Sequence, residues 1–100
     1  MTRLQSKRAL ITGGGQGLGR GIVEELLRRG CDVAIHYHKS FDGAEAVKQA
    51  APTGMRAQCF AADLTRDTAA QELVDRAVNF LGGLDILVNN AGDLIGRRKI

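Results

Sequence analysis

The sequence is poor in aromatic residues and in clustered charge. It has no tryptophan, one tyrosine and three phenylalanines, so aromatic residues make up only 4% of the chain. Proteins that bind single-stranded nucleic acids stack the bases on aromatic side chains, and this chain has too few for such a surface. Its net charge of +3 comes from scattered basic residues, and the one basic cluster, 97–99, is typical of a solvated tail. We therefore expect no nucleic-acid partner.

Cysteines are few and long apolar runs are missing. Cys31 and Cys59 have no further cysteine or histidine at ligand spacing, so neither a zinc site nor a disulfide framework is indicated. No apolar run approaches the roughly 20 residues of a transmembrane helix, and the first residues lack the apolar core of a signal peptide. We expect no metal, no membrane partner and a cytoplasmic location. A composition with 44% hydrophobic and 25% charged residues fits one globular domain or part of one.

Glycine, by contrast, is abundant and concentrated in one stretch. Six of the 13 glycines lie between Gly13 and Gly21, after the apolar run Ala9–Ile11 and at the start of a segment with helical spacing of apolar residues. A strand that turns sharply into a helix needs residues without Cβ, both for the turn and to let a bulky anion approach the backbone. The N–H groups at the start of the helix would face that anion. We expect a phosphate or pyrophosphate here, and a side chain at Gly17 or Gly19 to fill the space it needs.

Two other interpretations of the glycines are weaker. A P-loop would continue with Gly-Lys and then Ser or Thr, whereas Arg20 and Gly21 follow Gly19. A merely flexible turn would not require a strand before it and an amphipathic helix after it, and both are predicted here. The context therefore favours nucleotide binding.

Two motifs resemble those of one enzyme family. The segment Thr12–Gly19, Thr-Gly-Gly-Gly-Gln-Gly-Leu-Gly, matches the TGxxxGxG signature of the short-chain dehydrogenase/reductase family, and Asn89–Gly92 matches its NNAG motif. The segment between them is also similar to the family pattern, so the resemblance covers nearly the whole chain. It implies an NAD(P)-dependent oxidoreductase that transfers hydride between nicotinamide and a carbonyl, hydroxyl or enoyl-type substrate, 3-oxoacyl-reductase-like or pteridine-reductase-like.

Strands and helices are predicted to alternate along the chain. Such alternation favours an α/β fold with a parallel sheet built by right-handed crossovers. The Rossmann-type order places the strands 3-2-1-4, with the first two helices on one face and the third on the other. Few residues follow the fourth strand, so we expect residues 1–100 to be the N-terminal part of a single NAD(P)-binding domain whose catalytic half is absent. The predicted strands are 8–12, 32–38, 55–61 and 84–89, and the predicted helices are 17–29, 41–51 and 65–81.

The end of the second strand bears on the choice of cofactor. In dinucleotide folds an acid roughly 20 residues past the glycines accepts from the NAD 2′-hydroxyl, whereas basic residues accommodate the NADP 2′-phosphate. This chain has His36, Tyr37, His38, Lys39 and Ser40 there and no acid. The segment resembles the HYHxS version of pteridine-reductase-like members, which implies NADP(H) rather than NAD(H), with all but the tyrosine around the 2′-phosphate. A pair of partly exposed histidines beside a solvated lysine remains the alternative.

The resemblance implies further contacts beyond the third and fourth strands. Asp63 resembles the family aspartate that accepts from the adenine amino group, with the backbone of Leu64 beside it. Its alternative role is to cap the helix predicted to begin near Thr65. Asn89 is expected to stabilise the sheet. The cofactor-binding residues that we expect are Thr12, Gly13, Gly15, Gln16, Gly17, Leu18, Gly19, His36, His38, Lys39, Ser40, Asp63, Leu64, Asn90, Ala91 and Gly92.

The catalytic residues of the family, a Ser and a Tyr-x-x-x-Lys pair, cannot be placed. The only tyrosine is Tyr37, and Phe41 stands where the lysine would be needed. Protonating a carbonyl oxygen requires such a positioned acid, so we expect the chain alone to be inactive. A small-molecule substrate and a homo-oligomer are expected only for the complete protein. A non-catalytic dinucleotide-binding or regulatory module, or a truncated inactive remnant, stays open.

Overall fold

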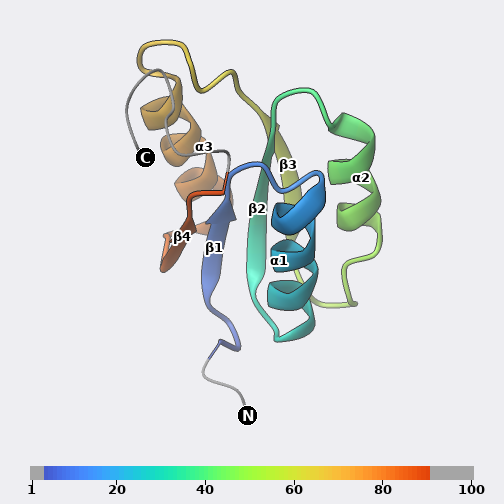
Figure 1. Cartoon of the computed structure of the whole chain (residues 1–100). Helices are drawn as coiled ribbons and strands as arrows, with labels where there is room; N and C mark the ends of the chain where they lie inside the picture. Colours follow the sequence, from blue (N-terminus) through green and yellow to red (C-terminus); the bar gives the residue numbers. More distant parts are fainter. Residues whose placement is uncertain (1–3, 91–100) are drawn as a thin grey trace.

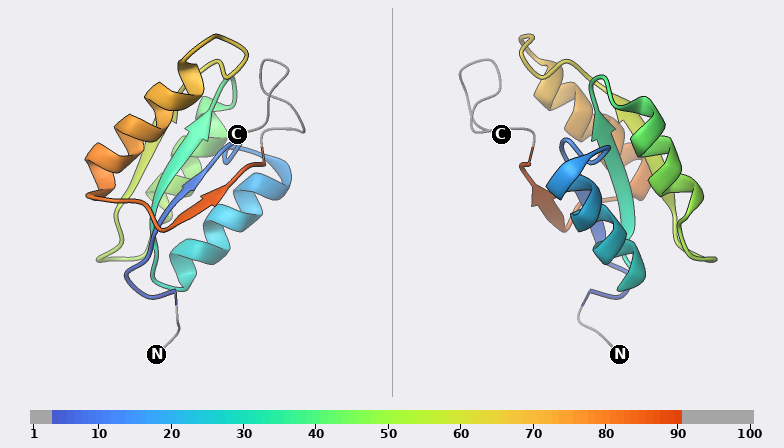
Figure 2. Two further views of the ribbon diagram at one scale, coloured as in Figure 1. Left: turned by 90° about the vertical axis from the view of Figure 1, so that its left-hand side faces the viewer. Right: turned by 45° about the vertical axis from the view of Figure 1, so that its right-hand side comes forward.

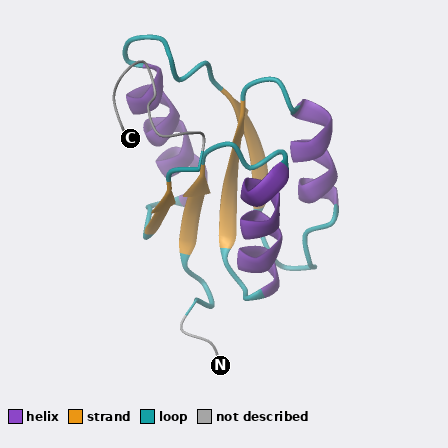
Figure 3. Cartoon of the chain, viewed as in Figure 1, coloured by secondary structure: helices purple, strands orange, loops and turns teal. Residues whose placement is uncertain are grey.

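A computed structural model describes residues 4–90, which form a parallel four-stranded sheet between two layers of helices (Figure 1). The strand order is β3-β2-β1-β4, and all three neighbouring pairs are parallel, which confirms the predicted α/β Rossmann-type arrangement. Strands and helices alternate as predicted (Figure 3). The elements are β1 (Arg8–Ile11), α1 (Gly17–Arg28), β2 (Asp32–Tyr37), α2 (Phe41–Gln49), β3 (Ala57–Ala61), α3 (Ala69–Leu81) and β4 (Ile86–Val88).

Two apolar cores cover the two faces of the sheet, because helices lie on both sides (Figure 2). In β1, Ala9 and Ile11 pack with α1 and α2, whereas Leu10 packs with α3. All three are completely buried, which explains why the run is apolar without alternation. The first two helices therefore lie on one face and the third on the other, as predicted. Within residues 4–90, no helix combines the length and hydrophobicity needed to cross a membrane.

The predicted start of the third helix is wrong. The sequence predicts a helix from residue 65, but α3 begins at Ala69. The Asp63 carboxylate accepts hydrogen bonds from the Thr65 N–H at 3.1 Å and the Thr65 hydroxyl at 2.6 Å, and the Arg66 N–H donates to the Asp63 carbonyl. Thr68 then adopts a left-handed φ of +66°. A side-chain turn therefore replaces the first helical turn, because Asp and Thr side chains compete with the helix for backbone groups.

The fourth strand is also shorter than predicted. Among the described residues it pairs only with β1, from Ala9 opposite Ile86 to Ile11 opposite Val88. The Thr12 N–H makes the last backbone contact, with the Val88 carbonyl at 3.0 Å, before the glycine loop begins at Gly13. The end of β4 thus coincides with the start of the glycine loop.

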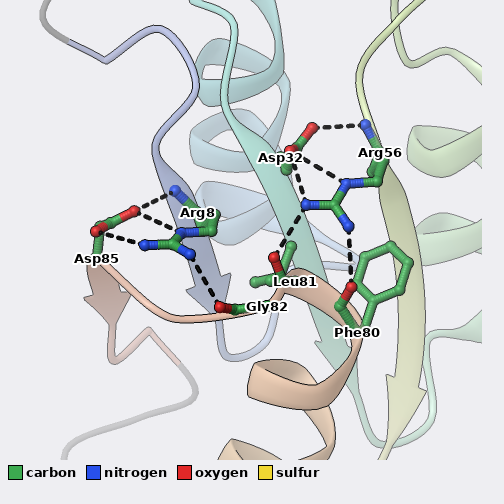
Figure 4. Close-up of polar contacts among 7 residues, drawn as sticks. All are labelled: Arg8, Asp32, Arg56, Phe80, Leu81, Gly82 and Asp85. Carbon is green, nitrogen blue, oxygen red and sulfur yellow. Dashed lines mark hydrogen bonds and ion pairs between the residues drawn. The ribbon is translucent and has the colours of Figure 1, made fainter.

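Two arginines hold the end of α3 at the edge of the sheet where the strands begin (Figure 4). Arg56 donates to the carbonyls of Phe80 and Leu81, each at 3.0 Å, and pairs with Asp32 at 3.1 Å. The last turn of α3 contains no basic residue of its own. Two of the free carbonyls at this helix end are therefore satisfied by the side chain of the residue just before β3.

The second arginine, Arg8 of β1, likewise binds a carbonyl that follows α3 and a nearby aspartate. Arg8 donates to the carbonyl of Gly82 at 3.0 Å and forms an ion pair with Asp85 at 3.0 Å (Figure 4). The guanidinium lies against Gly83, where a Cβ would overlap it. Together the two arginines fix the turn that leads from α3 into β4.

Candidate functional site

A cleft of about 420 Å³ lies at the opposite edge of the sheet, beyond the carboxyl ends of β1 and β2. Open α/β sheets bind ligands at this edge. Apart from Tyr37, all of the residues that line it are among those that the sequence predicts to bind a cofactor. They are Gly13, Gly15, Gln16, Gly17, His36, Tyr37, His38, Lys39, Ser40 and Asn90.

The glycine loop brings the start of α1 to the cleft. Gly13 and Gly17 have left-handed φ values of +66° and +57°, which only glycine adopts without strain. A Cβ at Gly17 would meet no atom within 4 Å. Gln16 at the N-cap makes no capping hydrogen bond through its side chain. The first N–H groups of α1 thus lie beside open space, as an anion site at a helix start requires.

The other glycines of the loop are needed for contacts within the protein. A Cβ at Gly19 would overlap the carbonyl oxygen of Gly13 and the side-chain amide of Asn90. A Cβ at Gly15 would lie 2.6 Å from the carbonyl oxygen of Ser40. Gly19 is therefore required because α1 packs on the loop, whether or not a cofactor also needs space there.

Gly43 is a glycine of this region that sequence reasoning missed. It lies in α2, where a Cβ would overlap the carbonyl oxygen of Gly15. The helix start and the loop thus touch backbone to backbone. The only signal in the sequence is that glycine is unfavourable inside a helix, and this suggests a close approach without saying to what.

His36 differs most from its predicted role. Its side chain is buried with the residue 2% exposed, and Nδ1 accepts a hydrogen bond from the Gly13 N–H at 2.9 Å. Nε2 lies 2.9 Å from the carbonyl oxygen of Ala62. Burial lowers the pKa of this histidine. Both ring nitrogens are therefore engaged by backbone, so the expectation that His36 contacts a 2′-phosphate is corrected, and so is the alternative that it is partly exposed.

Three polar residues after the buried histidine line the rim of the cleft. The side chains of His38 and Lys39 are exposed, and Ser40 stands at the N-cap of α2. Among residues 4–90, no carboxylate forms an ion pair with Lys39. The cleft lining contains no Asp or Glu. This end of the cleft is consequently suited to an anion.

Asp63 lies beside the rim, outside the residues that line the cleft. Its Oδ2 is 3.9 Å from Nε2 of His38. The hydrogen bond from the Thr65 hydroxyl is the main cause of the lowered pKa of Asp63. The suggestion that Asp63 caps α3 is wrong, because that helix begins at Ala69 and Asp63 instead holds the preceding turn. Leu64 is 7% exposed and packs in the α3 core.

Beyond β4, Asn90 joins the fourth strand to the glycine loop. Its N–H donates to the Thr12 hydroxyl at 2.9 Å, and its side-chain amide donates to the Gly13 carbonyl at 3.2 Å. Thr12 is fully buried, and its hydroxyl also lies 3.4 Å from the Asn89 side-chain oxygen. Both asparagines therefore contribute to holding the loop. The predicted residues Ala91 and Gly92 lie outside the described residues.

The remaining predicted residue of the loop, Leu18, is 75% exposed in the first turn of α1. Residues 4–90 contain no group of three or more His, Cys, Asp and Glu side chains placed to hold a metal ion. The described part of the site thus consists of backbone N–H groups, a few small polar side chains and two basic ones. Such a set can bind an anionic ligand and orient it.

Comparisons with known proteins agree with this geometry. Residues 7–99 match the family described as short chain dehydrogenase. Hydroxynaphthalene reductase arp2 of Aspergillus fumigatus is 43% identical over 90 residues, which are 89% of this chain and 33% of that protein. The chain therefore spans about a third of the length of such curated relatives.

Solved structures give the same relationship. A short chain dehydrogenase from Burkholderia cenocepacia in complex with NADP has a TM-score of 0.86 and 48% identity, covering 92% of this chain and 38% of that one. FolM alternative dihydrofolate reductase 1 from Brucella suis, also in complex with NADP, has a TM-score of 0.80 and 38% identity, covering 87% of this chain and 36% of that one. From its sequence match, its fold and its glycine loop, this chain belongs to the short chain dehydrogenase family.

Proposed function

We propose that this chain is the NADP(H)-binding portion of a short chain reductase. The observation that carries the proposal is the rim of the cleft, where Lys39 stands without a carboxylate partner among the described residues and no acid lines the cleft. Two related proteins of this fold are complexes with NADP. A 2′-phosphate is the group that distinguishes NADP from NAD, and a lysine at this rim would bind it.

The cleft also fits the rest of a dinucleotide. The open space beside Gly17 and the uncapped start of α1 would hold the pyrophosphate. His38, Lys39 and Ser40 would hold the 2′-phosphate at the other end of the lining. Asp63 and the backbone of Leu64 would contact the adenine. When bound, NADP(H) supplies the hydride, while the protein binds and orients the cofactor.

For the complete protein we propose reduction of a small carbonyl or enoyl-type substrate, of the 3-oxoacyl-reductase or pteridine-reductase kind. Asn90, Ala91 and Gly92 would lie along the cofactor's ribose. These 100 residues contain no Tyr-x-x-x-Lys pair, so the chain alone should bind cofactor without reducing a carbonyl. That same feature favours the second candidate, a dinucleotide-binding module without catalysis. A Tyr-x-x-x-Lys sequence downstream in the encoding DNA would decide for the reductase.

The test is a titration of NADPH and NADH against the wild type and Lys39→Ala, at low and high salt. A charged hydrogen bond to phosphate contributes roughly 1.5–3 kcal/mol, so Lys39→Ala should weaken NADPH about ten- to a hundredfold. NADH should bind as before, and added salt should reduce the preference for NADPH in the wild type. Lys7→Ala is the matched control, because exposed Lys7 precedes β1 at the far edge of the sheet. Equal affinity for both cofactors in the wild type, or unchanged NADPH affinity in Lys39→Ala, would refute the assignment.

A further inference from the structure

His36 makes three hydrogen bonds that join β2 to two other segments of the chain. Its ring Nδ1 accepts from the Gly13 N–H, and its ring Nε2 meets the carbonyl of Ala62, each at 2.9 Å. Its own backbone carbonyl accepts from the Gly14 N–H at 2.8 Å. One residue of β2 thus holds two successive N–H groups of the glycine loop and the chain just beyond β3.

These contacts fix the tautomer of the imidazole. A backbone N–H can only donate, so Nδ1 must be without a proton to accept from Gly13. The carbonyl of Ala62 can only accept, so Nε2 carries the proton. A doubly protonated ring would direct an Nδ1–H at the Gly13 N–H inside a buried contact. The observed arrangement therefore requires neutral His36.

Both backbone polar groups of Gly13 are hydrogen-bonded. His36 binds its N–H, while the Asn90 side chain donates to its carbonyl oxygen. Gly19 packs on the same carbonyl, because a Cβ at Gly19 would overlap it. A displacement of Gly13 would consequently displace the start of α1. That helix start is where the first N–H groups face the cleft.

We propose that His36 is a positioning residue that holds the glycine loop and the start of α1 in the conformation that binds the pyrophosphate. This inference rests on the proposed function, in which the cleft binds a dinucleotide. It differs from the role of a 2′-phosphate ligand in one measurable respect. The pyrophosphate is common to NADPH and NADH, so losing His36's contact with Gly13 weakens both cofactors equally. Losing a 2′-phosphate ligand such as Lys39 weakens NADPH alone.

Two substitutions test the contacts of the two ring nitrogens separately. In His36→Asn the side-chain oxygen can take the place of Nδ1 and accept from Gly13, whereas the contact with Ala62 is lost. In His36→Gln the side-chain amide reaches the place of Nε2 and can donate to Ala62, whereas Gly13 loses its acceptor. Each variant keeps one of the two side-chain contacts and loses the other. Comparing them therefore separates the effect of the Gly13 contact from the effect of the Ala62 contact.

The experiment titrates NADPH and NADH against the 100-residue chain and both variants, and measures hydrogen exchange of the Gly13 amide by NMR. Leaving a buried donor without its acceptor is expected to weaken both cofactors about tenfold in His36→Gln, by the same factor for each. His36→Asn should restore most of the affinity. The Gly13 amide should exchange faster in His36→Gln and at nearly the wild-type rate in His36→Asn.

Three results would overturn the positioning role. The first is weakening of NADPH alone in His36→Gln, which would make the ring a phosphate ligand. The second is equal loss in both variants, which would mean that His36 only fills space. The third is Gly13 exchange that is the same in the two variants. If the wild type binds neither cofactor, the proposed function fails, and the exchange rates still decide whether His36 holds the loop.

Discussion

The α-carbon of Gly19 lies so close to the carbonyl oxygen of Gly13 that a Cβ at position 19 would overlap that oxygen. The first turn of α1 therefore packs directly on the loop that precedes it. Gly21, in the same helix, is exposed, and a Cβ there would meet no atom within 4 Å. Substitution by alanine should therefore have opposite effects on stability at these two positions of one helix.

Gly19→Ala should lower the free energy of unfolding by about 1–3 kcal/mol, because the added methyl group overpacks a closed contact. Gly21→Ala should raise it by roughly 0.5–1 kcal/mol, because alanine loses less conformational entropy in a helix. Urea denaturation followed by circular dichroism measures both. A Gly19→Ala protein as stable as the wild type would show that α1 can move away from the loop without cost.

Gly17→Ala should reduce cofactor binding by a different mechanism. Both Gly17 and Gly54 have a left-handed φ and open space around the missing Cβ. An alanine at either position should cost about 1–2 kcal/mol in stability, the penalty of a left-handed conformation. Only Gly17 faces the cleft, so only Gly17→Ala should also weaken NADPH and NADH. Comparable cofactor affinities in the two variants would show that Gly17 does not contribute to the pyrophosphate site.

The stability of the fold should depend on pH through His36. Burial lowers its folded-state pKa below the usual value of about 6.5. The unfolded chain therefore binds the proton first as pH falls, so the free energy of unfolding should decrease from about pH 6.5 downward until the folded histidine also protonates. The titratable groups near it are His38, two residues further along the chain, and Asp63, which lies 3.9 Å from the His38 ring and directly follows Ala62. The segment 12–19 contains no charged residue. The pKa of Asp63 is lowered from 3.8, so its contribution is lost at more acidic pH.

Urea titrations between pH 5 and 8 test this, with His36→Asn as the reference. The slope can reach about 1.4 kcal/mol per pH unit for one proton. His36→Asn should lack that slope, because the titrating ring is removed. Parallel curves for the two proteins would mean that His36 titrates alike in the folded and unfolded chain.

Arg56→Ala should destabilise the chain through the end of α3. Its guanidinium donates to the carbonyls of Phe80 and Leu81 and to Asp32. Losing these hydrogen bonds should cost about 1–3 kcal/mol, and Arg56→Lys should recover little, because an ammonium cannot reproduce the planar fork. Arg28→Ala is the control: its side chain is 71% exposed, and its one ion pair within residues 4–90 is with Glu25 on its own helix, so a change within about 0.5 kcal/mol is expected. Equal losses in Arg56→Ala and Arg28→Ala would contradict this role for Arg56.

The outer edge of β4 should promote self-association. Among the described residues β4 has one neighbour, β1, and Leu87 is 42% exposed. Open apolar edges pair with other chains, so sedimentation should show a mass that increases with concentration. Leu87→Lys should reduce this association, whereas Val78→Lys, on an exposed part of α3, should have a smaller effect. A wild type that remains monomeric at all concentrations would show that this edge is protected.

The parts of the fold that depend on local patterns could be predicted from the sequence. The unbroken apolar run of β1 and the glycines after it predict a buried parallel strand and a tight turn, and both are confirmed. The start of α3 could not be predicted in this way, because residues 65–68 contain no glycine or proline. The helix is delayed by the hydrogen bonds of Thr65 to Asp63 and by the left-handed Thr68.

The site was predictable in location and less so in the role of each residue. The polar segment after β2 points to the carboxyl edge of the sheet from the fold alone. The role of His36 depends on where β3 ends, because Ala62, the residue after β3, supplies the carbonyl that pairs with its Nε2. The need for Gly43 likewise depends on how close α2 comes to Gly15. Such contacts join residues far apart in the sequence, and no spacing rule encodes them.

The two arginines that fasten α3 lie at the edge of the sheet where the strands begin, whereas His38, Lys39 and Ser40 lie where they end. Substitutions that share no partner usually have additive effects on stability. A library that randomises positions 38–40 to change cofactor preference should therefore leave the contribution of the Arg8 and Arg56 contacts to stability unchanged. For the same reason, later substitutions that strengthen the Arg8 and Arg56 contacts should not change the cofactor preference selected at positions 38–40.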